Sequence, residues 1–163
     1  MVLIVDFDGT FLKNDFFKEA FFKKLIENPF FLAKHFFFHR KSVLDLKMHL
    51  LKDLCISYDI NFLVNSPVLK WIEENKGNYE KVIMVSASPG FFIKQLMTPL
   101  HIFDEIHGSE DINLKGLKKL KFINDRWGDD FSYIGDSAAD KCIFTASKKG
   151  FRVSKKGMIN ETN

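Results

Sequence analysis

The sequence is poor in the features that mark secreted, zinc-binding and membrane-spanning proteins. Its two cysteines, Cys55 and Cys142, are too few for a disulfide framework and have no neighbouring metal-ligand partners. No run of about 18 apolar residues occurs, so no segment is expected to span a membrane. Residues 1–6 lack the basic start of a signal peptide. We therefore expect a cytoplasmic protein whose cysteines are reduced.

The chain also has little net positive charge with which to bind a large polyanion. The formal net charge is +3, and it arises in residues 12–63, which hold nine Lys and Arg against six Asp and Glu. This excess is too small to predict nucleic-acid binding, although it suits an anionic substrate or an anionic lipid surface. With 46% hydrophobic and 28% charged residues, the composition predicts one packed domain with at most a modest insertion.

Short apolar runs alternate with helical patterns along most of the chain. The runs Val2–Val5, Val82–Val85 and Phe131–Ile134 are typical of strands buried on both faces of a parallel sheet. Alternation of strand and helix predicts an α/β fold with a Rossmann-like parallel sheet. The helices are expected over residues 67–75, 89–97, 115–127 and 137–147.

The first two strands are separated by about 75 residues, which is too long for a simple crossover. One helix of this stretch belongs to the core, so residues 12–63 are expected to form an inserted helical unit. Its helices are expected near residues 15–27, 29–39 and 42–55. The core then comprises residues 1–11 and 64–155, and the polar residues 156–163 are expected to form a flexible tail.

Polar side chains follow each of the three strands at its end. Asp6 and Asp8 follow the first strand, Ser86 the second and Asp136 the third, with Asp140 four residues later. Ligands of open parallel sheets bind at the carboxyl ends of the strands, so these residues are expected to meet. Clustered carboxylates raise each other's pKa, which a Mg²⁺ ion would relieve. The alternative is that each Asp only forms a turn or caps a helix, but the convergence favours a metal site.

The chain contains four short motifs: Asp6-Phe7-Asp8-Gly9-Thr10, Ser86 after an apolar strand, Lys115-Gly116, and Gly135-Asp136-Ser137-Ala138-Ala139-Asp140. In this order they resemble the motifs of haloacid-dehalogenase-like (HAD) hydrolases. The inserted unit resembles a small type-1 helical cap, and residues 103–140 are similar to the HAD domains that many bacterial proteins fuse ahead of a membrane prenyltransferase domain.

The resemblance implies an enzyme, a phosphatase that hydrolyses a phosphate monoester through a covalent intermediate. Asp6 would be the nucleophile that becomes an aspartyl-phosphate, and Asp8 would be the general acid and base. An alcohol leaving group needs a proton whereas a halide does not, so Asp8 favours a monoester. Ser86, Lys115 and Thr10 would bind the phosphate, and Lys115 would neutralise its developing charge.

The resemblance also implies Mg²⁺ as the cofactor. Asp6, Asp136 and the backbone carbonyl of Asp8 would be its protein ligands, and Asp140 would support Asp136. The substrate would be a small or lipid-linked phosphate ester. Two alternatives remain: a phosphotransferase that uses the same intermediate, and a non-catalytic partner domain of a membrane prenyltransferase.

The inserted unit is unusually rich in phenylalanine, with nine between residues 16 and 38, interleaved with lysines. Phe17, Phe21 and Leu25 have the spacing of a stripe that packs inside the unit. Adjacent phenylalanines cannot all face one side of a helix, so contact with a membrane or lipid chain, or with another subunit, stays open beside internal packing. A peripheral membrane location is therefore an alternative to a purely cytoplasmic one.

Overall fold

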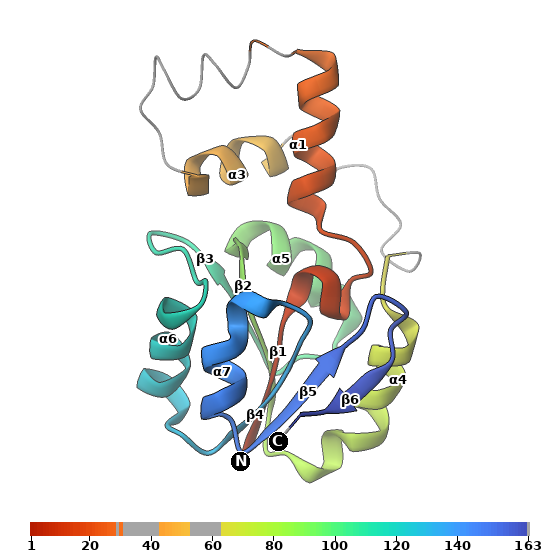
Figure 1. Cartoon of the computed structure of the whole chain (residues 1–163), viewed down its shortest axis with the longest axis vertical. Coiled ribbons are helices and arrows are strands. Elements are labelled where there is room, and N and C mark those ends of the chain that lie inside the picture. Colours follow the sequence, from red (N-terminus) through yellow and green to blue (C-terminus); the bar gives the residue numbers. More distant parts are fainter. Residues whose placement is uncertain (29, 31–42, 53–62, 163) are drawn as a thin grey trace.

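A computed structural model describes residues 1–28, 30, 43–52 and 63–162, which form a mostly parallel six-stranded sheet with helices on both faces (Figure 1). The predicted α/β fold is thereby confirmed. The strand order is β3-β2-β1-β4-β5-β6, and only β6 runs antiparallel to its neighbour. The strands are β1 (Val2–Val5), β2 (Val82–Pro89), β3 (Glu105–Ser109), β4 (Phe131–Gly135), β5 (Lys149–Val153) and β6 (Ile159–Glu161).

Helices cover both faces of the sheet. Neighbouring residues of β1 point to opposite faces, and all of them are apolar, so each face needs an apolar layer against it. Leu3 and Val5 pack with α4 (Ser66–Asn75) and α5 (Gly90–Met97) in one apolar cluster. Ile4 packs with α6 (Leu117–Trp127) and α7 (Lys141–Ala146) in a second cluster on the other face. All four residues of β1 are buried, which makes this strand the centre of the core.

Three strands were not predicted from the sequence, and one of them corrects a prediction. The segment 156–163 was expected to be a flexible tail, but Ile159–Glu161 forms β6 and pairs with Phe151–Val153 of β5. The pairing is possible because Val153 is buried and Ile159 packs partly against the core. The polar appearance of this segment reflects the exposed edge of the sheet rather than a lack of structure.

The inserted segment stands above the carboxyl ends of the strands, on the side opposite both termini (Figure 1). It contains α1 (Phe16–Glu27) and α3 (Val43–Lys52), and an isolated antiparallel bridge joins Leu12 to Val64 where the segment leaves and rejoins the core. The helix expected over residues 29–39 lies almost wholly outside the described residues. Among the described residues, no helix has the length and apolarity to cross a bilayer.

Large apolar side chains on and just after α1 differ in exposure. Phe21 is partly buried against the core, whereas Phe22 is 60%, Ile26 83% and Phe30 81% exposed. The expected contact of this region with lipid or with another subunit stays a prediction.

A close approach between β2 and β3 makes Gly108 indispensable for packing. A Cβ added there would lie 2.6 Å from the backbone of Gly90 and from the Ser88 carbonyl oxygen. We expect Gly108→Ala to destabilise the protein by roughly 1–3 kcal/mol, the usual range for overpacking. The matched control is Gly77→Ala, because a Cβ at Gly77 meets nothing within 4 Å. Thermal unfolding of both variants checks this, and equal melting temperatures would contradict it.

Candidate functional site

The polar residues selected from the sequence lie together at one edge of the sheet: Asp6 and Asp8 follow β1, Asp136 follows β4, and Ser86 lies within β2. In register, Val5 of β1 lies beside Met84 of β2 and Ile134 of β4, so β1 and β4 end at nearly the same level while β2 continues past them to Pro89. Beyond β1 the chain makes a wide turn over Phe7–Phe11, closed by the Leu12 amide, which donates to the Phe7 carbonyl at 2.9 Å, and Gly9 adopts φ 72° within it. Because left-handed backbone disfavours a Cβ, glycine suits this reversal.

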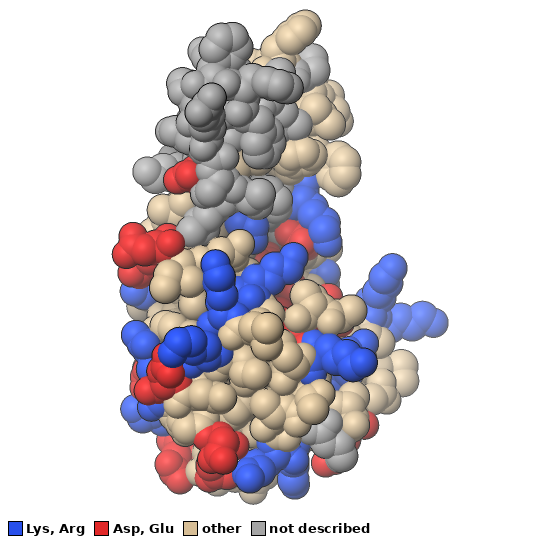
Figure 2. Space-filling view, turned by 60° about the vertical axis from the view of Figure 1, so that its left-hand side comes forward, with Lys and Arg blue, Asp and Glu red and all other residues tan. Residues whose placement is uncertain are grey.

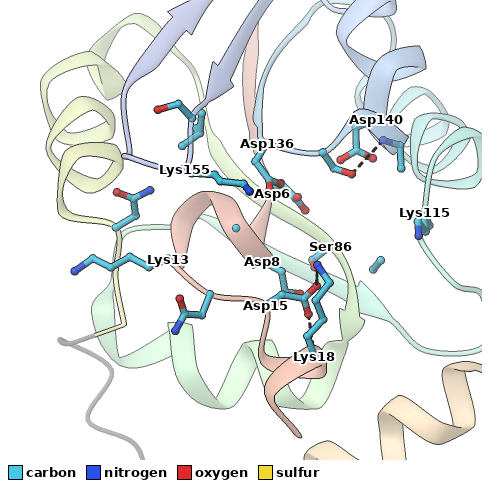
Figure 3. Close-up of a pocket in the computed structure, with 18 of the residues that line it drawn as sticks. Asp6, Asp8, Lys13, Asp15, Lys18, Ser86, Lys115, Asp136, Asp140 and Lys155 are labelled. Carbon is cyan, nitrogen blue, oxygen red and sulfur yellow. Dashed lines mark hydrogen bonds and ion pairs between the residues drawn. The ribbon is translucent and has the colours of Figure 1, made fainter. Parts of the chain in front are cut away.

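These strand ends open into a cavity of about 990 Å³. It is lined by Asp6, Asp8, Ser86, Asp136 and Asp140 from the core and by residues of the inserted segment, including Asp15, Lys18 and Lys47. Figure 3 shows the carboxylates of Asp6 and Asp136 close to each other in this cavity, with Asp8 and Ser86 beneath them. Of the predicted site residues, all but Thr10 line the cavity, and the buried Thr10 contacts Asp136 from behind it.

Asp6 forms a buried ion pair with Lys119, a residue that the sequence analysis did not select. The Lys119 ammonium donates to Asp6 Oδ1 at 2.7 Å and to the Tyr133 hydroxyl at 3.0 Å. The Tyr133 hydroxyl in turn donates to Asp140 Oδ2 at 2.8 Å. Lys119 is 2% exposed, so this chain of contacts is shielded from solvent and links the ends of β1 and β4 to α6.

Lys115, the predicted partner of the phosphate, lies on the rim of the cavity instead. Gly116 precedes the helix with φ 57° and α6 begins only at Leu117, so Lys115 is outside the helix and exposed. The helix therefore starts two residues later than predicted, which places Lys119 in its first turn. A signal was present in the sequence, because Lys119, Ile123 and Trp127 have the i, i+4, i+8 spacing of a stripe that faces the sheet.

Asp8 is held by Ser88, a second residue that the sequence analysis missed. The Ser88 hydroxyl donates a short hydrogen bond to Asp8 Oδ2, and the Ser88 amide donates to Ser86 Oγ at 3.1 Å. Burial raises the pKa of Asp8 to about 7, although the Ser88 hydrogen bond opposes the rise. The sequence predicted that β2 ends at Val85, whereas it continues to Pro89, and Ser86 and Ser88 share one face of the strand.

Asp136 lies against the turn that follows β1. A Cβ on Gly9 would lie 2.4 Å from Asp136 Oδ2, and the Thr10 hydroxyl donates to Asp136 Oδ1 at 3.4 Å. Burial raises the pKa of Asp136. Burial also raises the pKa of Asp6 to about 6, with Lys119 opposing and Asp140 adding to the rise.

The residues present fit a hard divalent cation. No set of three or more His, Cys, Asp or Glu side chains within the described ranges is spaced to hold a metal. The predicted Mg²⁺ ligands are two carboxylates, Asp6 and Asp136, and one backbone carbonyl, that of Asp8, which is the sparse protein set that Mg²⁺ accepts. Buried carboxylates whose pKa values are raised are the groups that such an ion would keep ionised.

Known structures share this architecture. Phosphoserine phosphatase in apo form matches 91% of the chain with a TM-score of 0.52 and 16% identity. For phosphoserine phosphatase from T. onnurineus in complex with NDSB-201, the TM-score is 0.53 and the sequence identity 21%. For a phospho-aspartyl intermediate analogue of phosphoserine phosphatase, the TM-score is 0.52 and the sequence identity 17%. The chain covers 84%, 81% and 84% of those structures, respectively. At these identities the likeness establishes the fold.

Sequence comparison adds one relative. "Uncharacterized protein y4nM" of Sinorhizobium fredii (strain NBRC 101917 / NGR234) is 26% identical over 89% of this chain. The chain spans 28% of the length of that relative. No protein-family model matches the chain.

The buried carboxylates make stability depend on pH in a defined direction. The pKa of Asp8 rises from 3.8 to about 7 on folding, so the folded state retains a proton that the unfolded state has already released. The resulting stability is present below about pH 4 and is lost as the pH rises through about 7. Without metal, we expect the melting temperature of the wild type to fall between about pH 4 and pH 8 when it is compared with that of Asp8→Asn at the same pH.

Mg²⁺ should reverse this trend, because a cation binds ionised carboxylates only. We expect Mg²⁺ to raise the melting temperature more at about pH 7.5 than at about pH 5, measured by thermal unfolding against a chelator control. Equal shifts at the two pH values, or no shift at either, would contradict the metal assignment.

Proposed function

We propose that the chain is a Mg²⁺-dependent phosphatase that hydrolyses a phosphate monoester of an alcohol through an aspartyl-phosphate on Asp6. One observation carries this proposal: the buried Asp6, paired with Lys119, shares a cavity with Asp8 and Asp136 at the ends of β1 and β4. The likeness to phosphoserine phosphatase structures supports it, since one of these is described as a phospho-aspartyl intermediate analogue.

The first step transfers the phosphoryl group to the protein. Lys119 binds Oδ1 of Asp6, which leaves Oδ2 to attack phosphorus. As the bond from Asp6 to phosphorus forms, the bond to the alcohol oxygen breaks, and Asp8 gives its proton to the leaving alkoxide. A pKa of about 7 for Asp8 keeps a substantial fraction of this acid protonated at neutral pH.

The second step releases phosphate. Asp8, now ionised, accepts a proton from a water molecule whose oxygen attacks phosphorus, and the bond between phosphorus and Asp6 breaks. Inorganic phosphate leaves and both aspartates return to their starting states. An acid with a pKa near the working pH suits both directions of proton transfer.

The remaining residues have supporting roles. Lys119 balances the charge of Asp6 and of the phosphoryl group, and Ser86 of β2 hydrogen-bonds a phosphoryl oxygen. The Thr10 hydroxyl orients Asp136 by a hydrogen bond. Asp140 accepts a hydrogen bond from the Tyr133 hydroxyl, which itself accepts one from Lys119 and so orients that lysine. When bound by Asp6, Asp136 and the Asp8 carbonyl, Mg²⁺ would supply positive charge to the phosphoryl oxygens.

Asp6→Asn tests the nucleophile. The amide cannot form the acyl phosphate, so we expect hydrolysis of p-nitrophenyl phosphate with Mg²⁺ to fall by at least about a thousandfold, the scale on which covalent catalysis is lost. Circular dichroism and thermal unfolding should show a folded protein. Full activity in the folded Asp6→Asn variant would refute the proposed mechanism.

The matched variants Lys119→Met and Lys115→Met test which of the two lysines contributes to catalysis. Removing a preorganised charge partner typically costs about 10²–10³ in kcat, so we expect a loss of that size for Lys119→Met. Lys115→Met should lose less than about tenfold, because exposed charges contribute on the order of 1 kcal/mol or less. Steady-state kinetics on folded variants decides, and a larger loss for Lys115→Met would return the catalytic role to Lys115.

A further inference from the structure

The turn between β5 and β6 presents two adjacent lysines on a hydrogen-bonded hairpin. Within it, the Gly157 amide donates to the Ser154 carbonyl at 2.8 Å, and the Ser154 amide donates to the Met158 carbonyl at 2.8 Å. The Met158 amide also donates to Ser154 Oγ at 3.1 Å. Lys155 and Lys156 occupy the two central positions of this turn and are exposed, so their backbone is fixed while their side chains face solvent.

This hairpin turn packs against Asn65, which hydrogen-bonds the segment that follows Asp6 and Asp8. Gly157 is buried with φ 76°, and a Cβ there would lie 2.7 Å from Asn65 Oδ1. The Asn65 side-chain amide donates to the Thr10 carbonyl at 3.0 Å, and its backbone amide donates to the Phe11 carbonyl at 2.8 Å. One residue therefore links the turn to the segment that follows β1, which sets the position of both lysines relative to the site.

Both lysines line the same cavity as the catalytic aspartates. Figure 3 shows Lys155 extending from the end of β5 toward Asp6 and Asp136, whereas Lys13 points away from them. Figure 2 shows Lys and Arg side chains on several sides of a hollow in which acidic atoms are visible. The cavity of about 990 Å³ is several times larger than a phosphate group, so a substrate can reach from the aspartates to the rim.

Within residues 1–28, 30, 43–52 and 63–162, Lys155 and Lys156 form no ion pair. Lys119 is paired with Asp6 and Lys18 with Asp15, but neither turn lysine has a carboxylate within 4.0 Å in the part of the chain that the structure describes. Two adjacent like charges repel, and a cavity wall with low dielectric strengthens their field toward an anion. The transferred phosphate already has Lys119 and Ser86 beside it, so these lysines suit a different anionic group.

We propose that Lys155 and Lys156 form a second anion subsite, so that the preferred substrate is a phosphate monoester whose alcohol carries another phosphate, phosphonate or carboxylate group. The proposal rests on the proposed function, because it takes the aspartate cluster as the site of the transferred phosphate. In this proposal, the β5–β6 turn selects the leaving group.

Alkane phosphonates test this without turnover, because their carbon–phosphorus bond is not a phosphate ester. The wild-type protein with Mg²⁺ is titrated calorimetrically with propylphosphonate and with alkane bisphosphonates whose linkers have two to five carbons, each corrected for Mg²⁺ binding by the ligand. We expect at least one bisphosphonate to bind about tenfold or more tightly than propylphosphonate, which corresponds to about 1.4 kcal/mol.

The variant Lys155→Ala/Lys156→Ala should bring that affinity ratio to within about twofold of one. The matched control Lys118→Ala/Lys148→Ala removes the same charge from exposed lysines outside the cavity and should keep the wild-type ratio. Gly157→Ala keeps both lysines but displaces the turn from Asn65, so it should also lower the ratio.

A ratio near one in the wild type would overturn the second subsite, and so would a ratio that survives in Lys155→Ala/Lys156→Ala. An equal loss in Lys118→Ala/Lys148→Ala would overturn it as well, since it would reflect overall charge. These binding results do not depend on hydrolysis, so failure of this proposal is distinguishable from failure of the Asp6 mechanism.

Discussion

The ion pair between Lys119 and Asp6 is the contact on which the organisation of the site depends. Its two atoms lie 2.7 Å apart and both side chains are almost fully buried. Each charge alone would be very unfavourable in that environment, and losing one partner of a buried pair typically costs about 3–5 kcal/mol. The first turn of α6 is therefore held against the end of β1, and the loop carrying Asp8 and Gly9 begins from a fixed point.

The position of β1 in the middle of the sheet explains how distant parts of the sequence converge on this pair. β1 has β2 on one side and β4 on the other, so the residues after all three strands share one edge. Ser88 reaches Asp8 from β2, while Tyr133 reaches Lys119 from β4. Each aspartate after β1 is thus held by a polar side chain from a neighbouring strand or helix, which limits the orientations that either carboxylate can adopt.

The sequence was sufficient to predict the parts of the molecule that are buried and repetitive. The apolar runs of β1, β2 and β4 identified the parallel sheet, and the polar residues at their ends located the cavity. Strands β3 and β5 were missed because Glu105–Ser109 and Lys149–Val153 include charged or small residues suited to less buried positions. Edge pairing in β6 depends on a partner strand that local periodicity cannot show.

Side-chain contacts inside the site were harder to predict than its location. Lys115 was chosen because it was expected to begin a helix, but Gly116 delays that helix and Lys119 has the length to reach Asp6 from its first turn. Ser88 lay beyond the expected end of β2, and nothing in a single sequence indicates that a serine hydroxyl will bind a particular carboxylate. Both contacts, Lys119 with Asp6 and Ser88 with Asp8, join residues that are far apart in the sequence, so only the folded structure reveals them.

The ring of Tyr133 limits which residue can stand at position 135, directly before Asp136. The Tyr133 ring folds back over the end of β4, and a Cβ at position 135 would lie 2.7 Å from Tyr133 Cε1. Any side chain there would displace the hydroxyl that joins Lys119 to Asp140. The two positions should therefore covary among homologues: lineages that replace the tyrosine with a smaller residue are free to lose the glycine, and those that keep it are not.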